Sequence, residues 1–112
     1  MLDGLTANFE RYLDLLSARQ KLVSSNIANA DTPGYRTQDV DFQFEFVSLA
    51  KGQQPQTVEA QGLKEKPDGN NVSLDREARL LAENAMRFNI AATLLRGTLR
   101  TVQEAIQGGN GT

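Results

Sequence analysis

The sequence predicts an all-α fold in which two long helices, one at each end of the chain, pair as an antiparallel coiled-coil hairpin. Three observations predict it: a heptad pattern in the last third of the chain, a weaker one in the first thirty residues, and a middle stretch without sustained periodicity. We expect an N-terminal helix over residues 1–30, a turn and an irregular or partly extended middle over residues 31–72, and a C-terminal helix with a glycine-rich tail over residues 73–112. A length of 112 residues fits one structural unit.

The C-terminal helix is predicted by apolar or small residues that recur in alternating steps of four and three. Such a pattern, held over this length, is typical of a helix wound against other helices. Ser73 is a suitable N-cap, and Gly108 and Gly109 are expected to end the helix. We call the set the first stripe; it comprises Leu74, Ala78, Leu81, Ala85, Phe88, Ala92, Leu95, Leu99, Val102 and Ile106.

A second stripe lies on roughly the opposite side of the same helix and comprises Met86, Ile90, Leu94 and Gly97. A helix that is apolar on two sides is buried on two sides. Either the middle segment of the chain or a neighbouring subunit could cover this second stripe. Because a two-helix hairpin shares only one apolar face, we expect the subunit to complete its core with copies or relatives of itself. Leu80 lies outside both stripes and is expected to matter less for packing.

The N-terminal helix is predicted by an apolar pattern at Leu2, Leu5, Phe9, Tyr12, Leu16, Val23 and Ala30. Two polar residues, Arg19 and Asn26, interrupt this pattern. We expect Arg19 to extend its charged end toward solvent from the edge of the apolar face. A polar residue inside such a pattern often fixes the register of packing at a cost in stability, so Asn26 is a candidate for that role.

A turn follows the first helix at Thr32, Pro33, Gly34 and Tyr35. Proline and glycine suit the two central positions of a type II turn, which requires a positive φ at Gly34. The last four carbonyl groups of a helix lack partners within it, and asparagine offers both donors and an acceptor. We therefore predict that Asn26 and Asn29, on either side of Ile27, are buried and anchor the turn to the middle segment or to an adjacent subunit. The alternative is that both asparagines face solvent near a fraying helix end.

The middle segment carries weaker signals. Val40, Phe42, Phe44 and Phe46 alternate with polar residues, which favours an extended segment whose phenylalanines lie on the helices, although a short helix is the alternative. Residues 51–71 are rich in polar residues, proline and glycine, and should be mobile in an isolated monomer. Within them, residues 67–70 predict a turn whose neighbours could pair as a short hairpin.

The residue inventory opposes catalysis. The chain has no histidine and no cysteine, which removes the usual general bases, thiol nucleophiles and commonest metal ligands. With a net charge of −2 and no basic patch, it gives no reason to expect nucleic acid, and no site for a cofactor or small-molecule substrate is evident. No apolar run is long enough to span a membrane, and the N-terminus does not resemble a cleaved signal peptide.

Residues 24–35 read Ser-Ser-Asn-Ile-Ala-Asn-Ala-Asp-Thr-Pro-Gly-Tyr and resemble the N-terminal signature of bacterial flagellar axial proteins. Within that family, residues 36–42 and 68–77, together with Ala82-Glu83-Asn84-Ala85 and Arg87-Phe88, resemble the basal-body rod proteins. The resemblance covers both predicted helices and their junctions. The long inserted domains of distal rod and hook relatives have no room in this chain.

The resemblance implies a structural subunit of the proximal rod, the shaft that joins the rotor to the outer flagellum, needed for motility. It also implies export through the flagellar type III apparatus without a cleaved signal, and a place on the periplasmic side of the basal body. The implied partners are copies of the chain and other rod and basal-body proteins. From the apolar pattern and the helix end, we expect the interaction residues to lie in the turn after the first helix and in the two stripes. A generic coiled-coil adaptor or export chaperone stays open as an alternative, and an enzyme is opposed by the residue inventory.

Overall fold

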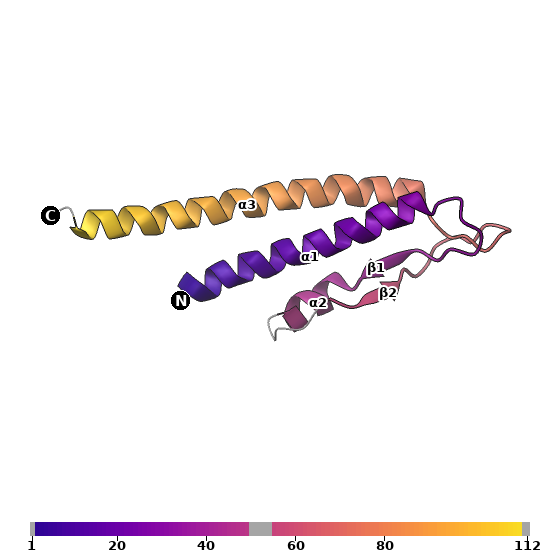
Figure 1. The fold of residues 1–112 in the computed structure, drawn as a ribbon, viewed down its shortest axis with the longest axis horizontal. Coiled ribbons are helices and arrows are strands. Elements are labelled where there is room, and N and C mark those ends of the chain that lie inside the picture. The colour runs from indigo at the N-terminus through magenta and orange to yellow at the C-terminus, as the bar shows by residue number, and fades with distance from the viewer. Residues whose placement is uncertain (1, 50–54, 111–112) are drawn as a thin grey trace.

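The computed structural model describes residues 2–49 and 55–110, and it confirms the predicted all-α architecture with two long helices. Helix α1 spans Leu2–Ala28 and helix α3 spans Leu74–Asn110, and the two run antiparallel, side by side, along a molecule of 72 × 26 × 18 Å (Figure 1). Between them come strand β1 (Gln38–Val40), helix α2 (Phe42–Leu49) and strand β2 (Thr57–Glu59). Within the described residues, no helix has the length and hydropathy needed to cross a membrane.

The two long helices differ in length. At about 1.5 Å per residue, the 27 residues of α1 make a rod of about 40 Å and the 37 residues of α3 one of about 55 Å. The start of α3 and the end of α1 lie together at the turn, so α3 continues beyond the N-terminus of α1 (Figure 1). We call this part, residues 99–108, the overhang. The helix runs through Gly108 to Asn110, so the predicted stop at Gly108 is wrong.

The core lies along the α1–α3 contact. From α1 it takes Leu15, Leu16 and Val23, each at most 2% exposed. From α3 it takes Glu77, Asn84 and Ala91, which repeat every seven residues and are at most 4% exposed. The contact face of α3 is therefore small or polar where it meets α1.

The first stripe does not lie at the centre of this contact, although its Ala92 and Leu95 are half-buried. Leu74, Leu81 and Phe88 are 56%, 40% and 45% exposed, and Leu80, expected outside both stripes, is half-buried. Each buried residue of α3 follows a first-stripe residue by three positions, which is a rotation of about 60° around the helix axis. Two side-chain contacts accompany this rotation: Arg76 Nη2 donates to Asp39 Oδ2 of β1, and Asn84 Nδ2 donates to Gln20 Oε1 of α1 at 3.4 Å.

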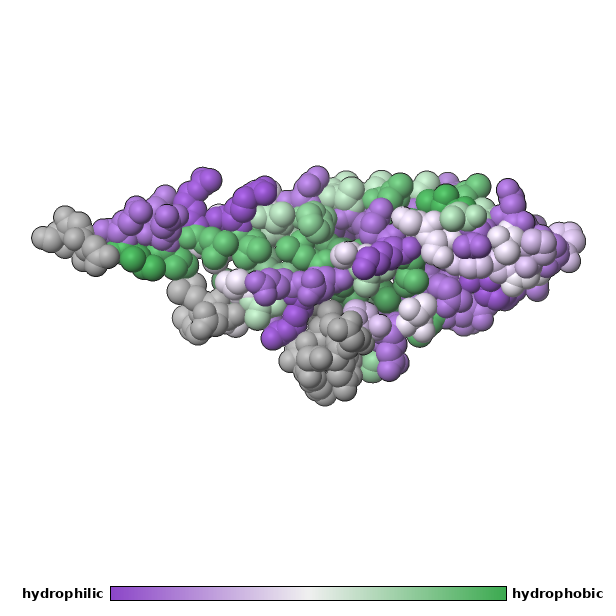
Figure 2. Space-filling model, in the orientation of Figure 1, coloured by the Kyte–Doolittle hydropathy of each residue, from purple (hydrophilic) through white to green (hydrophobic). Residues whose placement is uncertain are grey.

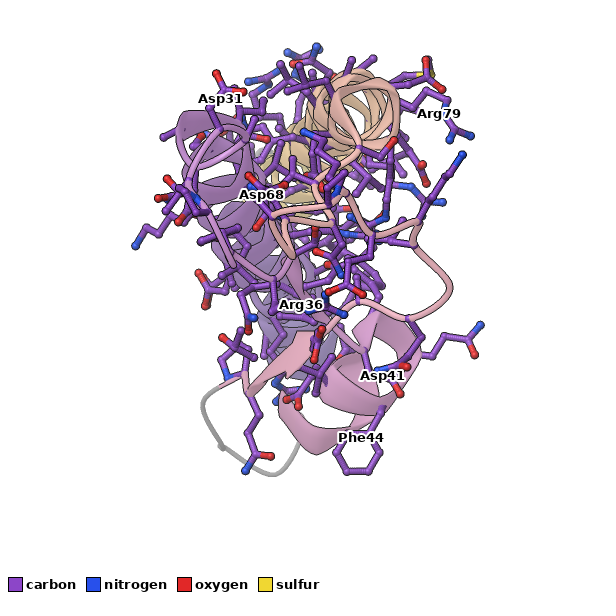
Figure 3. The ribbon with its side chains drawn as sticks, turned by 90° about the vertical axis from the view of Figure 1, so that its right-hand side faces the viewer. Asp31, Arg36, Asp41, Phe44, Asp68 and Arg79 are labelled. Atoms are coloured by element: carbon purple, nitrogen blue, oxygen red, sulfur yellow. The ribbon has the colours of Figure 1, made fainter. Side chains whose placement is uncertain are left out.

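The middle segment forms a small unit that packs on α1 (Figures 1 and 3). Strands β1 and β2 pair antiparallel, with Gln38 opposite Glu59 and Val40 opposite Thr57. The predicted extended segment ends at Val40, and the alternative of a short helix is correct from Phe42 onward. Asp41 caps this helix, because its Oδ1 accepts the amide of Phe44 at 3.2 Å and its carbonyl accepts the amide of Glu45 at 2.8 Å.

The phenylalanines of α2 do not all lie on the long helices. Phe42 is half-buried against α1, whereas Phe44 is 62% exposed and points away from the body of the molecule (Figure 3). The side chain of Phe46 lies outside the described side chains. A helix places successive residues about 100° apart, so it cannot present Phe42 and Phe44 to the same surface as a strand would.

The predicted turn at residues 67–70 is confirmed. The amide of Gly69 donates to the carbonyl of Lys66 at 2.9 Å, and Gly69 has a φ of 89°. The predicted hairpin around this turn is misplaced, because the strand pair joins residues 38–40 to 57–59 instead. Residues 51–54 of the segment predicted to be mobile lie outside the described residues, and mobility of the rest stays a prediction.

Candidate assembly interface

The C-terminal end of α1 is joined to the middle segment by the fully buried side chain of Asn26. Its Nδ2 donates to the carbonyl oxygen of Gln38 at 2.8 Å, and its Oδ1 accepts the amide of Gln38 at 3.0 Å. The same Oδ1 accepts the hydroxyl of Tyr35 at 2.9 Å. The Asn26 side chain therefore bonds both backbone groups of Gln38, as a residue on a neighbouring strand would. This confirms the predicted anchor to the middle segment.

Asn29 makes its side-chain contacts within the turn. Its Nδ2 donates to the carbonyl of Ser25 at 2.8 Å, and its Oδ1 accepts the hydroxyl of Thr32 at 3.0 Å. The side chain is half-buried, and the link from Asn29 to the middle segment runs through its backbone carbonyl, which accepts Nδ2 of Asn70 at 2.9 Å. The prediction of a buried side-chain anchor is therefore wrong for Asn29, because its side-chain amide bonds the local carbonyl of Ser25, which also accepts the backbone amide of Asn29 at 3.0 Å.

Two further asparagines, Asn70 and Asn71, complete this region and were not singled out by sequence reasoning. Asn70 Nδ2 also donates to the carbonyl of Thr32 at 2.8 Å, and its Oδ1 accepts the amide of Val72 at 2.8 Å. Asn71 Oδ1 accepts the amide of Thr37 at 2.6 Å. Both side chains are at most 2% exposed. We call Asn26, Asn29, Asn70 and Asn71 the asparagine junction.

The two turns of the junction lie against each other. The amide of Tyr35 donates to the carbonyl of Thr32 at 3.2 Å, and Gly34 has a φ of 74°, which confirms the predicted type II turn. The amide of Gly34 donates to the carbonyl of Asp68 at 2.9 Å. A Cβ atom built on Gly69 would lie 3.4 Å from Cα of Gly34, so the second turn has little space for a side chain where it meets the first.

Asp39 joins three elements in a mostly buried ion network. Arg19 of α1 binds it with both Nε and Nη2, each at 3.0 Å, and Nη2 of Arg76 from α3 reaches Oδ2 at 2.5 Å. Arg76 Nη1 also donates to Oε1 of the buried Glu77 at 2.7 Å. The expectation that Arg19 extends toward solvent is wrong, because the middle segment supplies a carboxylate at the edge of the apolar face.

Phe42 docks the start of α2 on the helix pair. Its ring lies edge-on to the ring of Tyr12, with centroids 5.8 Å apart. The guanidinium groups of Arg19 and Arg87 lie 5.7 and 6.0 Å from the centroid of Phe42. One aromatic ring therefore contacts cations from both long helices, an arrangement that favours a fixed position for α2.

Two arginines have pKa values raised above the ordinary value. For Arg36 the main cause is its hydrogen bond to Glu59, and for Arg87 it is the hydrogen bond to Tyr12. Because each pKa is higher in the folded state, the charged form stabilises the fold at any pH below the ordinary pKa of the unfolded chain. This stabilisation is lost only when the pH rises through the higher pKa of the folded state. Both groups therefore stay charged throughout the neutral range.

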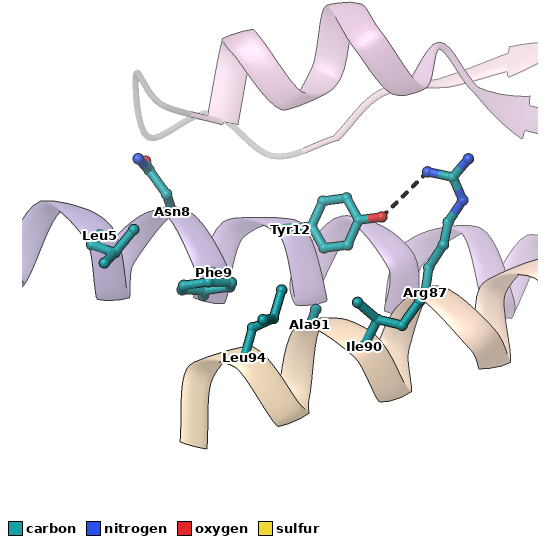
Figure 4. Close-up of a pocket in the computed structure, with 8 residues that line it drawn as sticks. All are labelled: Leu5, Asn8, Phe9, Tyr12, Arg87, Ile90, Ala91 and Leu94. Carbon is teal, nitrogen blue, oxygen red and sulfur yellow. Dashed lines mark hydrogen bonds between the residues drawn. The ribbon is translucent and has the colours of Figure 1, made fainter. Parts of the chain in front are cut away.

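Two apolar grooves flank the α1–α3 contact. The first, which we call the Leu94 groove, has a volume of about 500 Å³ (Figure 4). The second, the Phe88 groove, has a volume of about 370 Å³. The Leu94 groove is lined by Leu5, Asn8, Phe9, Tyr12, Arg87, Ile90, Ala91 and Leu94. The Phe88 groove is lined by Leu16, Ser17, Gln20, Leu81, Asn84, Ala85, Phe88 and Asn89.

The grooves divide the predicted stripes between them. Leu81, Ala85 and Phe88 of the first stripe line the Phe88 groove, whereas Ile90 and Leu94 of the second stripe line the Leu94 groove. Figure 2 shows an apolar band that runs from the free part of α3 toward the centre of the molecule. The middle segment thus leaves much of both stripes uncovered.

The remaining predicted interaction residues fall into two groups. Exposed residues are Ile27, Thr32, Pro33, Gly34, Leu74, Ala78, Met86 and Leu99. Half-buried residues are Asn29, Tyr35, Ala92 and Leu95. The structure does not bring all of them into one site, and their role in assembly stays a prediction.

The comparisons with known proteins point to one family. Residues 13–36 match the family described as flagella basal body rod protein. The chain is 31% identical over 138 residues to the flagellar basal body rod protein FlgB of Escherichia coli (strain K12), an alignment that covers 98% of this chain and 100% of that protein. It is 32% identical over 133 residues to FlgB of Yersinia enterocolitica, with 96% of this chain and 97% of that protein covered.

A more distant relative agrees. The flagellar basal body rod protein FlgB of Bacillus subtilis (strain 168) is 25% identical over 126 residues, covering 97% of this chain and 98% of that protein. The similarity thus extends over both long helices and the asparagine junction between them. This chain belongs to the FlgB family of flagellar basal body rod proteins.

Proposed function

We propose that this chain is a structural subunit of the proximal rod of the flagellar basal body, the shaft that connects the rotor to the outer flagellum. The observation that carries the proposal is the apolar surface that the helix pair leaves open. Met86, Ile90 and Leu94 are each more than half exposed, and the Leu94 groove is lined mainly by apolar side chains. The Phe88 groove adds the apolar side chains of Leu81 and Phe88. A surface of this kind marks an interaction site with other protein.

The proposed partners are copies of this chain and other rod and basal-body proteins. The subunit reaches the periplasmic side of the basal body through the flagellar type III export apparatus, without a cleaved signal. Its role is to pack, not to catalyse, in keeping with a sequence that has no histidine and no cysteine. The residues proposed to contact neighbours are the exposed members of the two stripes, and the asparagine junction sets the direction in which the middle segment leaves them.

Deletion and complementation in a motile host test the proposal. We expect loss of the gene to abolish swimming, and purified basal bodies from the complemented strain to contain the protein in the rod. Leu94→Glu should remove the protein from basal bodies while leaving it folded and exported. The matched control is Lys64→Glu, because Lys64 is exposed in the middle segment and lines neither groove, and this variant should assemble normally.

The alternative of a coiled-coil adaptor or export chaperone predicts a different result. A chaperone would remain in the cytoplasm, bound to another rod protein, and would be absent from purified basal bodies. If the chain were recovered only from the cytoplasm, the proposal would be overturned.

A further inference from the structure

The contact between the two long helices joins an apolar side of α1 to a side of α3 that is polar at two of its three buried positions. The buried residues of α3 are Glu77, Asn84 and Ala91. Beside them, Leu81 and Phe88 are 40% and 45% exposed. Burial of apolar surface is the main favourable term when helices pack, so this contact leaves part of the available attraction unused.

The amide of Asn84 is buried but only partly hydrogen-bonded. The side chain is 4% exposed, and its Nδ2 donates to Oε1 of Gln20 on α1 at 3.4 Å, longer than the roughly 2.9–3.0 Å typical of such a bond. Its Oδ1 has no hydrogen-bond partner among the described residues. A polar group that leaves water without gaining a partner costs free energy, so the amide opposes the contact that buries it.

Glu77 brings a second oxygen of this kind into the contact, one heptad earlier. Its side chain is fully buried, and Oε1 accepts Nη1 of Arg76 at 2.7 Å. Within the part of the chain that the structure describes, Oε2 has no partner. Arg76 belongs to the same helix, so this pair does not itself join α3 to α1.

We propose that Asn84 keeps the α1–α3 contact weaker than an apolar residue would, so that α3 can shift against α1 when neighbouring subunits cover the grooves. Asn84 lies where such a shift would be felt, because it lines the Phe88 groove beside Leu16 and Gln20. Residues that cost stability are retained where function needs adjustable packing. The role in assembly rests on the proposed function, whereas the weakness of the contact does not.

Thermal unfolding of the purified chain tests the cost of the amide. Asn89→Ala is the matched control for Asn84→Ala, because Asn89 is exposed on the same helix and gains the same helix propensity. We expect Asn84→Ala to unfold at a higher midpoint than its control, with slower amide exchange between Glu77 and Ala91. Asn84→Leu, compared with Asn89→Leu, covers the case in which alanine leaves a cavity. If neither Asn84 variant exceeds its control, the amide stabilises the contact and the inference is wrong.

Recovery from purified basal bodies tests the consequence for assembly. Whichever Asn84 variant is the more stable should be recovered at a lower level than its Asn89 control, relative to the amount of each chain that is exported. If the stabilised variant is incorporated as well as its control, the weakness of the contact has no role in assembly and the inference is overturned.

A second substitution separates weak helix packing from a direct contact between Asn84 and a neighbour. Leu80 is half-buried and lines neither groove, so Leu80→Ala loosens the packing of α3 without changing a groove wall. Added to the stabilised Asn84 variant, it should lower the midpoint and restore incorporation. If the midpoint falls and incorporation stays low, Asn84 contacts a neighbour directly and the inference is wrong. Absence of the unmodified chain from basal bodies would instead overturn the proposed function, and the unfolding comparison would still decide the strength of the contact.

Discussion

At the residue scale, single polar side chains hold the two helices and the middle segment together. Asn26 could be predicted as an anchor, because a buried amide in an apolar pattern needs partners and the following turn supplies backbone groups. Asp39 could not, because nothing local distinguishes it from Asp41 two residues later. Its importance comes from Arg19 and Arg76, which lie 20 and 37 residues away in the sequence.

Replacing Asn26 by leucine should destabilise the protein, although leucine suits the apolar pattern better. The substitution leaves the amide and carbonyl of Gln38 without their partner, which costs about 1–3 kcal/mol in the free energy of unfolding. Chemical denaturation of the purified protein measures this. Asn89→Leu, at an exposed position of α3, is the matched control and should change the free energy by no more than about 0.5 kcal/mol. We also expect Asn26→Leu to lower rod assembly, and normal assembly would show that Asn26 is not a register device.

Removing the carboxylate of Asp39 should have a larger effect. Asp39→Ala leaves two mostly buried arginines facing each other without their shared partner, and breaking a buried ion pair in this way costs about 3–5 kcal/mol. The control is Asp75→Ala, whose exposed pair with Arg79, at 3.6 Å, contributes about 0.5 kcal/mol or less. If Asp39→Ala and Asp75→Ala lowered the denaturation midpoint equally, the Asp39 ion network would not be important for stability.

At the element scale, the pairing of α1 with α3 was predictable and the rotation of α3 was not. Apolar periodicity identifies both helices, but α3 has two apolar sides, and periodicity alone does not say which side meets α1. The side of α3 that meets α1 carries Arg76 and Asn84, whose partners come from β1 and α1. The contact face therefore contains Glu77, Asn84 and Ala91, and the larger side chains point into the grooves.

The same substitution at two alanines should separate folding from assembly. Ala91 is 4% exposed in the helix contact, so Ala91→Leu overpacks it and should lower the free energy of unfolding by about 1–3 kcal/mol. Ala85 is exposed in the Phe88 groove, so Ala85→Leu should leave unfolding unchanged within about 0.5 kcal/mol while it reduces incorporation into basal bodies. Denaturation and basal-body purification, run on both variants, give the comparison. If Ala85→Leu assembles fully, the Phe88 groove is not an interface.

Leu80→Ala serves as the intermediate case. Because Leu80 is half-buried, its truncation should cost about half of the roughly 2–5 kcal/mol typical of a fully buried leucine, and it should not block a groove. We therefore expect Leu80→Ala to affect unfolding more than Ala85→Leu, and to affect assembly of the folded protein less.

At the scale of the whole molecule, the hairpin architecture followed from the sequence, whereas the contacts of the middle segment did not. The composition of residues 55–71 does not predict one structure. Nevertheless, hydrogen bonds of Asn70, Asn71 and Lys66 join this segment to residues 29–37. These contacts link residues more than 30 positions apart, and no local pattern reports them. Periodicity likewise predicts that α3 has two apolar sides, but it does not say how much of each side the rest of the chain leaves exposed.

Amide hydrogen exchange should reveal a gradient along the isolated monomer. The amides of α3 between Glu77 and Ala91, which pack on α1, should exchange slowly, and those of the overhang should exchange fast because packing supplies most of the stability of a helix. In assembled rods the overhang should become protected. Slow exchange of the overhang in a proven monomer would show that α3 is stable without a neighbour.

The hydrogen bonds that join α1 to the other elements are concentrated toward its C-terminal end, where the asparagine junction lies. Among the side chains of α1 that the structure describes, from residue 4 onward, every hydrogen bond between α1 and another element involves Tyr12 or a later residue. We therefore expect the N-terminal turns of α1 to separate from α3 more readily than the turns next to the asparagine junction.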